Sequence, residues 1–269
     1  MPPPPFRDEL SVALAAAHAA GDIIRGHYQR GPVEPTAKPD GTPVTQADLE
    51  ANQAIVAALR AAFPKDGLLA EETADDRSRL AHERVWIVDP MDGTRDFVQR
   101  SDQFAVHIAL AVGGAPVVAV VYSPIERLTY HAVAGYGACV DSTPLSVSRV
   151  RNLEHFKIGV SRFGLNDNMR DFIAHSKLGK NTVPIGASLK MMAVARGAIE
   201  ISLALTDFES EWDTCAPELI VREAGGRFTD LDGQPFVYNK PDVRHRRGIL
   251  VSNGTRHDEL LELVRPFYR

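Results

Sequence analysis

Hydrophobic and polar positions follow two different periods along this chain. Apolar residues recur every three or four positions near its start, which predicts an amphipathic helix over Arg7–Arg30. Thr45 and Asp48 stand three residues apart, as in a capping box, and predict a second helix that ends at about Phe63, before a proline. Both helices are expected to be scaffold.

Short apolar runs follow and predict strands at Val85–Val88, Phe104–Val112, Pro116–Tyr122 and Leu128–Val133. These strands favour a large, mainly antiparallel sheet beside the first two helices. From about Asp141, strands and helices alternate in the α/β manner. The strands are expected at Lys157–Val160, Thr182–Ile185, Ile199–Leu205, Arg227–Asp230 and Gly248–Val251, and the helices near Asp167–Ser176, Leu189–Arg196, Asp213–Ala224 and Arg256–Val264. The fold class is therefore α/β with an α+β first half, and we expect halves at 1–140 and 141–269 in one compact unit without a linker.

Composition argues against nucleic-acid binding, secretion and membrane insertion. The net charge of −5 and the pI near 6.0 give no sign of a surface that binds nucleic-acid polymers. The two cysteines lack metal-finger spacing and suit a reducing cytoplasm, and the opening residues lack the regions of a signal peptide. Residues 104–122 are apolar, but Gly113, Gly114 and Pro116 interrupt them, so we interpret them as a buried β-hairpin and expect no membrane insertion.

Acidic residues gather where apolar elements end. The run Val85–Val88 ends at Asp89, and we expect the strand to stop there because the following proline cannot donate to a ladder. Asp92 comes next, and then Gly93 and Thr94, which suit a tight turn into a helix whose first N–H groups are unpaired. Carboxylates attract a hard cation and free N–H groups attract an anion. The stretch therefore predicts a metal and a phosphate side by side.

Glu71 and Asp213 also stand at the ends of apolar elements and are expected in the same cluster. Two carboxylates about 4 Å apart repel by ~4 kcal/mol at an effective dielectric of 20, so four together need cations or protons. Ligands that are all oxygen indicate Mg²⁺, with Mn²⁺ as a usable substitute.

Each of these residues also has a purely structural interpretation, because acids and hydroxyls at helix starts are often caps. Asp213 fits an N-cap, with Pro217 still inside the first turn of its helix. Thr94 can cap the helix that it begins, and Asp48 can be only the acid of its capping box. The two uses are compatible.

The order Asp89-Pro90-Met91-Asp92-Gly93-Thr94, with Glu71-Glu72 upstream and Trp212-Asp213 downstream, resembles the inositol monophosphatase family of magnesium-dependent, lithium-sensitive phosphomonoesterases. The resemblance runs roughly from Lys38 to Val251. It implies a layered αβαβα sandwich, a small phosphate ester as substrate, inhibition by Li⁺ or Ca²⁺, and a possible homodimer.

The same resemblance assigns roles to individual residues. It implies that Glu71, Asp89 and the Met91 carbonyl hold one ion, and that Asp89, Asp92 and Asp213 hold a second. Asp48, after a lysine like Lys38, would lie beside a third, weakly bound ion. Glu71 and Thr94 would orient the water that attacks phosphorus directly, without a phosphoenzyme. The implied substrate contacts are Gly93, Thr94, Ser161, Ser188, Lys190 and Asp213.

The segment Gly186-Ala187-Ser188-Leu189-Lys190 opens a predicted helix and suits a second anionic group. It resembles the G-S-S-x-K of 3′(2′),5′-bisphosphate nucleotidases, as does Arg95-Asp96 after Asp92-Gly93-Thr94, although Ala187 departs from the pattern. A bisphosphate nucleotidase is therefore the favoured activity. Inositol-1-monophosphatase and histidinol-phosphate phosphatase share the same core motifs and stay open.

Two other classes of protein fit the sequence less well. Haloacid-dehalogenase phosphatases have a D-x-D-G-T loop, but Asp89 and Asp92 are three residues apart, and acids on one strand face are two apart. Asp230-Leu231-Asp232-Gly233 has that spacing, but Gln234 follows, and we interpret it as a turn. A non-catalytic protein on the same fold that binds nucleotides or metabolites is disfavoured because all four acids and Thr94 are present.

Overall fold

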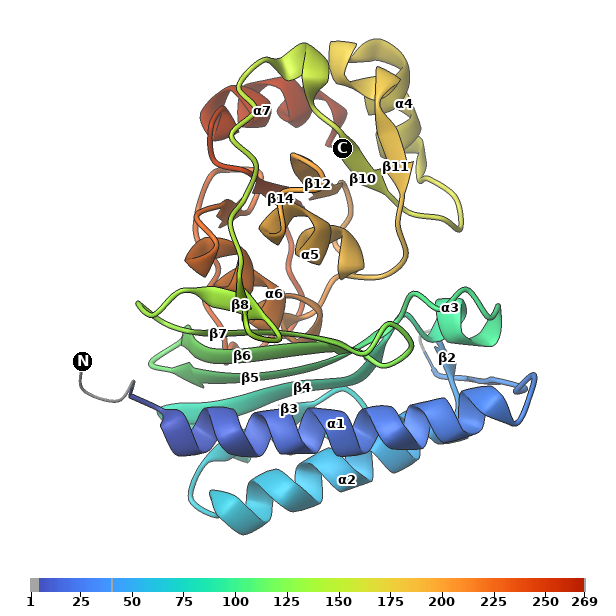
Figure 1. The fold of residues 1–269 in the computed structure, drawn as a ribbon, viewed down its shortest axis with the longest axis vertical. Helices are drawn as coiled ribbons and strands as arrows, with labels where there is room; N and C mark the ends of the chain where they lie inside the picture. Colours follow the sequence, from blue (N-terminus) through green and yellow to red (C-terminus); the bar gives the residue numbers. More distant parts are fainter. Residues whose placement is uncertain (1–4, 40, 269) are drawn as a thin grey trace.

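The computed structural model describes residues 5–39 and 41–268. Figure 1 shows five layers: the helices α1 and α2, a large sheet, the helices α5 and α6, a second sheet, and the helices α4 and α7. The predicted αβαβα sandwich is confirmed. The helices have the bounds α1 Arg7–Gln29, α2 Gln46–Ala62, α3 Thr94–Val98, α4 Asp167–His175, α5 Leu189–Ala195, α6 Glu211–Glu223 and α7 His257–Val264.

The large sheet has seven strands in the order β3-β4-β5-β6-β7-β8-β9. Their bounds are β3 Gly67–Ala70, β4 Arg84–Asp92, β5 Ala105–Val112, β6 Ala115–Ser123, β7 Leu128–Val133, β8 Ala138–Val140 and β9 Thr143–Pro144. Neighbours pair antiparallel except β3 and β4, which are parallel. β3, β8 and β9 were not predicted from the sequence. The expected division between residues 140 and 141 remains a prediction.

The second sheet has five strands in the order β11-β10-β12-β14-β13, with parallel pairing at β11-β10-β12 and antiparallel pairing at the other edge. The bounds are β10 Ile158–Val160, β11 Thr182–Pro184, β12 Ile201–Ala204, β13 Arg227–Thr229 and β14 Ile249–Ser252. The short pair β1 Thr36–Ala37 and β2 Pro43–Val44 lies apart from both sheets. Apart from β4, predicted element boundaries agree with the structure to within two residues.

The strand β5 shows how the large sheet separates two cores. Successive side chains on a strand point to opposite faces. Val106, Ile108 and Leu110 pack with the buried side chains of α1 and α2, whereas Ala105, Ala109 and Ala111 pack with those of α5 and α6. The small alanines let the two middle helices approach the sheet closely. These helices therefore start directly above the ends of the central strands.

The apolar segment 104–122 forms the antiparallel pair β5–β6, as predicted. Within the part of the chain that the structure describes, no helix combines the length and apolar character needed to cross a bilayer.

Close packing of α1 on the sheet yields a stability prediction. A Cβ at Gly21 would lie 2.2 Å from Tyr122 Cε1, whereas a Cβ at Gly26 would meet nothing within 4 Å. The Tyr122 ring cannot easily move, because its hydroxyl accepts a 2.9 Å hydrogen bond from Arg25. We expect Gly21→Ala to lower the free energy of unfolding by about 1–3 kcal/mol.

The matched variant Gly26→Ala should raise it by about 0.5–1 kcal/mol, because alanine favours the helix without a clash. Urea unfolding followed by circular dichroism measures both changes. Equal effects of the two substitutions would contradict the packing of α1 described above.

Candidate active site

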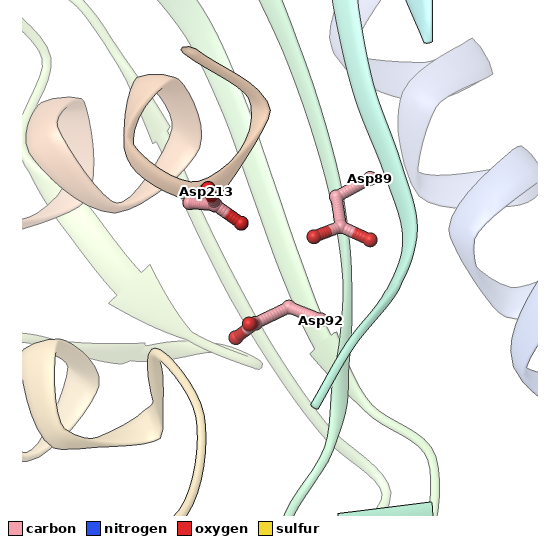
Figure 2. A group of neighbouring side chains, drawn as sticks. All are labelled: Asp89, Asp92 and Asp213. Atoms are coloured by element: carbon pink, nitrogen blue, oxygen red, sulfur yellow. The ribbon is translucent and has the colours of Figure 1, made fainter. Parts of the chain in front are cut away.

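Three aspartates meet between the large sheet and α6. Asp89 and Asp92 lie on β4 and Asp213 lies on the first turn of α6, and their carboxyl groups converge in Figure 2. One carboxylate oxygen from each lies within 4.8 Å of the other two. Residues more than 100 positions apart in the chain thus form one cluster, as the sequence predicted.

The prediction that the strand stops at Asp89 is wrong. β4 continues through Pro90 to Asp92, and its register with β5 shifts between Asp89 and Asp92. Pro90 is tolerated because β3 pairs with β4 only as far as Val88, so no neighbour on that side needs its missing donor. The irregularity turns both carboxylates toward the cluster, since a bulge breaks the strict alternation of faces.

The predicted start of the last long helix is also corrected. α6 begins at Glu211, its N-cap is Ser210, and Asp213 is the third helical residue instead of the N-cap. One carboxylate oxygen of Asp213 accepts a 2.5 Å hydrogen bond from the Ser210 N–H, which forms half of a capping box. Pro217 consequently lies beyond the first turn, inside the helix. Asp213 therefore helps to begin α6 and also faces the cluster.

Glu71 reaches the same edge of the sheet because it follows β3. The parallel register places Ala70 beside Val88, one residue before Asp89. Lys38 Nζ lies 2.7 Å from a Glu71 oxygen and also pairs with Glu72. Although burial disfavours its charged form, these two carboxylates raise the pKa of Lys38. The ammonium group thus remains charged and offsets part of the negative charge.

Asp48 forms the predicted capping box and also contacts Thr94, while its place beside a third ion remains a prediction. One of its oxygens accepts hydrogen bonds from the N–H and hydroxyl of Thr45, at 2.7 and 2.6 Å, and completes the capping box of α2. The other accepts a 2.9 Å hydrogen bond from the Thr94 hydroxyl. Thr94 is not the cap of its helix, because Gly93 occupies the N-cap with a φ of 92°. The Thr94 hydroxyl is therefore held by a buried carboxyl beside the cluster.

The electrostatics of the cluster fit a hard cation. Burial, followed by the charges of Glu71, Asp92 and Asp213, raises the pKa of Asp89 well above its usual value. Burial and the same kind of repulsion, from Asp92 and Glu71, do so for Asp213. Four carboxylates without histidine or cysteine offer the oxygen ligands that Mg²⁺ prefers. A divalent ion would replace protons there and relieve the repulsion.

A pocket of about 250 Å³ opens beside the acids. Its wall includes Asp92, Asp213, Ser188 and Lys190, which the sequence singled out, and also Glu209, which it did not. The Lys190 ammonium donates to the carbonyl of Ala187. Burial raises the pKa of the Glu209 carboxyl, while a 2.8 Å hydrogen bond from Thr206 and the charge of Lys190 oppose the rise. The pocket thus contains side chains of both signs.

Several residues singled out from the sequence do not line this pocket, among them Gly93, Thr94, Ser161 and Arg95. Ser161 is exposed just after β10, and its hydroxyl oxygen lies 3.3 Å from the Phe163 N–H. Arg95 is exposed on α3, while the adjacent Asp96 is buried and accepts from the Ser101 hydroxyl. The role of Ser161 as a substrate contact remains a prediction.

Comparison with known proteins agrees with this geometry. Residues 7–266 match the model of the inositol monophosphatase family. The chain belongs to the inositol monophosphatase family. It is 34% identical over 232 residues to the 3′(2′),5′-bisphosphate nucleotidase CysQ of Salmonella typhimurium, covering 85% of this chain and 93% of that protein. It is 35% identical over 265 residues to the histidinol-phosphatase of Mycobacterium tuberculosis, covering 94% and 96%.

A solved inositol monophosphatase from Thermotoga maritima has the same fold. The TM-score is 0.84 at 28% identity, and the match covers 97% of this chain and 98% of that one. As an inositol monophosphatase family member, the chain is a phosphoric monoester hydrolase that acts on small phosphate esters. The family depends on magnesium, consistent with the acidic cluster. The haloacid-dehalogenase and non-catalytic alternatives are thereby set aside.

The pKa shifts in this family member predict how metal-free protein responds to pH. An unfolded aspartate titrates near 3.8, whereas burial, opposed by the hydrogen bonds from Thr45 and Thr94, raises the pKa of Asp48 to about 6. At a pH below both pKa values, Asp48 is protonated in the folded and the unfolded protein, so it costs no stability. At a pH above both, Asp48 is ionised in both states, and its poorly solvated carboxylate lowers the stability of the folded protein. We expect Asp48 alone to remove about 3 kcal/mol of unfolding free energy across this interval.

Asp89 and Asp213 should extend the fall to higher pH, and saturating Mg²⁺ should abolish most of it. Urea unfolding between pH 4.5 and 8, in EDTA or in Mg²⁺, measures the difference. As a control, Asp48→Asn should flatten the lower part of the EDTA curve. Parallel curves with and without Mg²⁺ would show that the cluster does not bind the ion.

Proposed function

We propose that the enzyme releases phosphate by direct attack of water at the aspartate cluster. The observation that carries this proposal is the convergence of Asp89, Asp92 and Asp213 within 4.8 Å, next to a Thr94 hydroxyl held by Asp48. No serine, cysteine or histidine nucleophile is needed for such chemistry. The Thr94 hydroxyl can accept from a water on its free side while it donates to Asp48, so it can orient that water toward phosphorus.

The ligand sets follow from the same arrangement. Glu71, Asp89 and the Met91 carbonyl would hold one Mg²⁺, and Asp89, Asp92 and Asp213 a second. When bound, these ions polarise the phosphoryl oxygens and favour ionisation of water. Asp89 would contact both ions. Its carboxyl group is held in place by a 2.9 Å hydrogen bond that one of its oxygens accepts from the Met91 N–H. The N–H groups of Gly93 and Thr94 would bind the phosphoryl oxygens.

For the substrate, we propose a 3′(2′),5′-bisphosphate nucleotide such as adenosine 3′,5′-bisphosphate. Lys190 supports this choice, because an ammonium at the pocket wall gives a second phosphate a partner away from the metal ligands. The CysQ relative, a 3′(2′),5′-bisphosphate nucleotidase, supports it as well. Lys190 would then leave the Ala187 carbonyl and turn toward the phosphate.

Histidinol-phosphate phosphatase is the second candidate, and Glu209 favours it. A carboxylate at the wall of the same pocket suits a leaving group with a positive charge and disfavours a second phosphate. The mycobacterial relative is a histidinol-phosphatase. Inositol 1-phosphate has no charged group on its leaving alcohol, so neither Lys190 nor Glu209 selects it.

Four further properties belong to the proposal. Mn²⁺ would substitute for Mg²⁺ because it accepts similar oxygen ligands. Li⁺ or Ca²⁺ would inhibit by occupying the site with unsuitable charge or geometry. The enzyme would also form a homodimer and be located in the cytoplasm.

The metal ligands are tested by Asp92→Asn. The substitution preserves shape but removes a negative ligand, so kcat should fall at least about 10³-fold, a loss of roughly 4 kcal/mol of transition-state stabilisation. Phosphate release at saturating Mg²⁺ measures the change. Asp258→Asn, on an exposed carboxyl paired with Arg227, should retain normal turnover. Near-normal turnover of the Asp92 variant would rule it out as a ligand.

The substrate is tested by comparing kcat/KM for adenosine 3′,5′-bisphosphate, inositol 1-phosphate and histidinol phosphate. We expect the bisphosphate to give the highest value. Lys190→Gln should reduce the value for the bisphosphate at least about tenfold, since a charge-assisted hydrogen bond contributes roughly 1.5–3 kcal/mol, and should affect inositol 1-phosphate much less. A preference for histidinol phosphate that Glu209→Gln abolishes would favour the second candidate instead.

A further inference from the structure

His107 is a buried polar residue on an otherwise apolar face of β5. The face that it shares with Ala105, Ala109 and Ala111 packs against α5 and α6, and its own side chain is fully buried. A buried imidazole needs a partner for each nitrogen. His107 finds both partners on the helices above it: Nδ1 lies 3.2 Å from the Trp212 carbonyl oxygen, and Nε2 lies 2.6 Å from the Ser188 hydroxyl oxygen.

The Trp212 carbonyl determines the direction of the first hydrogen bond. A carbonyl oxygen can only accept, so Nδ1 carries the proton and donates to Trp212. With the proton on Nδ1, the lone pair of Nε2 in a neutral ring accepts from the Ser188 hydroxyl.

Both ends of this chain of hydrogen bonds reach acids of the cluster. The Ser188 N–H donates to Oδ2 of Asp92 at 2.6 Å, and His107 Nε2 lies 3.7 Å from the same oxygen. Trp212 immediately precedes Asp213. Across the sheet, His107 stands opposite Asp89 in the β4–β5 register. One side chain therefore has a structural link to each of the three aspartates.

We propose that His107 is a positioning residue that holds Asp92 and the Trp212–Asp213 turn at the separation that a divalent cation requires. The inference rests on the proposed function only in taking these aspartates as Mg²⁺ ligands. His107 touches no ligand atom within hydrogen-bond distance and acts through Ser188 and the Trp212 carbonyl.

The physical reason is the repulsion among the carboxylates of the cluster. Carboxylates that repel one another move apart unless neighbouring groups fix them, and an ion must then spend binding energy to gather them. The bonds of His107 connect the sheet that holds Asp92 to the helix that holds Asp213. Removing an outer partner of this kind typically weakens metal affinity about 10–100-fold.

The experiment is a calorimetric titration of the metal-free full chain with Mg²⁺, without substrate. We expect His107→Ala to raise the Kd for Mg²⁺ at least about tenfold, and Ser188→Ala to raise it in the same direction. At saturating Mg²⁺, kcat of His107→Ala should recover most of its value, because the ion itself then gathers the ligands.

His257→Ala is the matched control. His257 is equally buried, with Nε2 2.8 Å from the Thr229 hydroxyl and Nδ1 2.8 Å from the Ser252 hydroxyl, but it lies at the start of α7. Its loss should lower the melting temperature without changing the Kd for Mg²⁺. A folded His107→Ala variant that also keeps the wild-type Kd would reduce His107 to a structural residue and overturn the inference.

If His107→Ala does not fold, His107→Asn and Ser188→Ala decide the question. The asparagine amide can still donate to Trp212 but is too short to reach Ser188, so its Kd should rise less than that of a full deletion of the chain of bonds. Unchanged affinity in both variants would overturn the inference. Wild-type protein that binds Mg²⁺ but releases no phosphate from any ester would instead refute the proposed function and leave the role of His107 standing.

Discussion

Mutual repulsion among buried carboxylates is the constraint on which the site depends. Asp89 is about 1% exposed, and one of its oxygens lies within 4.8 Å of one oxygen each from Asp92 and Asp213. The raised pKa values of Asp89 and Asp213 express the same fact, because neither burial nor crowding favours the charged form. The fold holds these carboxylates together against their repulsion. A bound cation relieves that repulsion, and the relief contributes to the affinity for the cation.

The sandwich supplies the necessary rigidity at the seam between its layers. β3 and β4 run parallel and deliver Glu71 and Asp89 to one edge of the large sheet. α5 and α6, enclosed between the two sheets in Figure 1, bring their first turns to the same edge. The approach is close enough that a Cβ on Gly93 would lie 2.8 Å from that of Ala187. Catalysis and packing therefore share the same few contacts.

Several polar residues serve the fold and the site at once. Asp48 caps α2 with one oxygen and holds Thr94 with the other, and Asp213 helps to cap α6 while facing the cluster. The sequence allowed such an acid to be both a cap and a functional group. The two oxygens of a carboxylate allow both, because each has lone pairs that point in a different direction.

The sequence by itself determined the order of the main elements, the α/β class and the acids of the cluster, because hydrophobic period and local motif spacing record them, and its family resemblance implied the αβαβα sandwich. Only the tertiary structure decided that β4 continues through Pro90, that Asp213 is the third residue of α6, and that His107 and Glu209 face the site. These features depend on strand register and helix packing, which join residues far apart in the chain. The apolar residues around His107 in the sequence do not indicate which groups on the facing helices will hydrogen-bond to it.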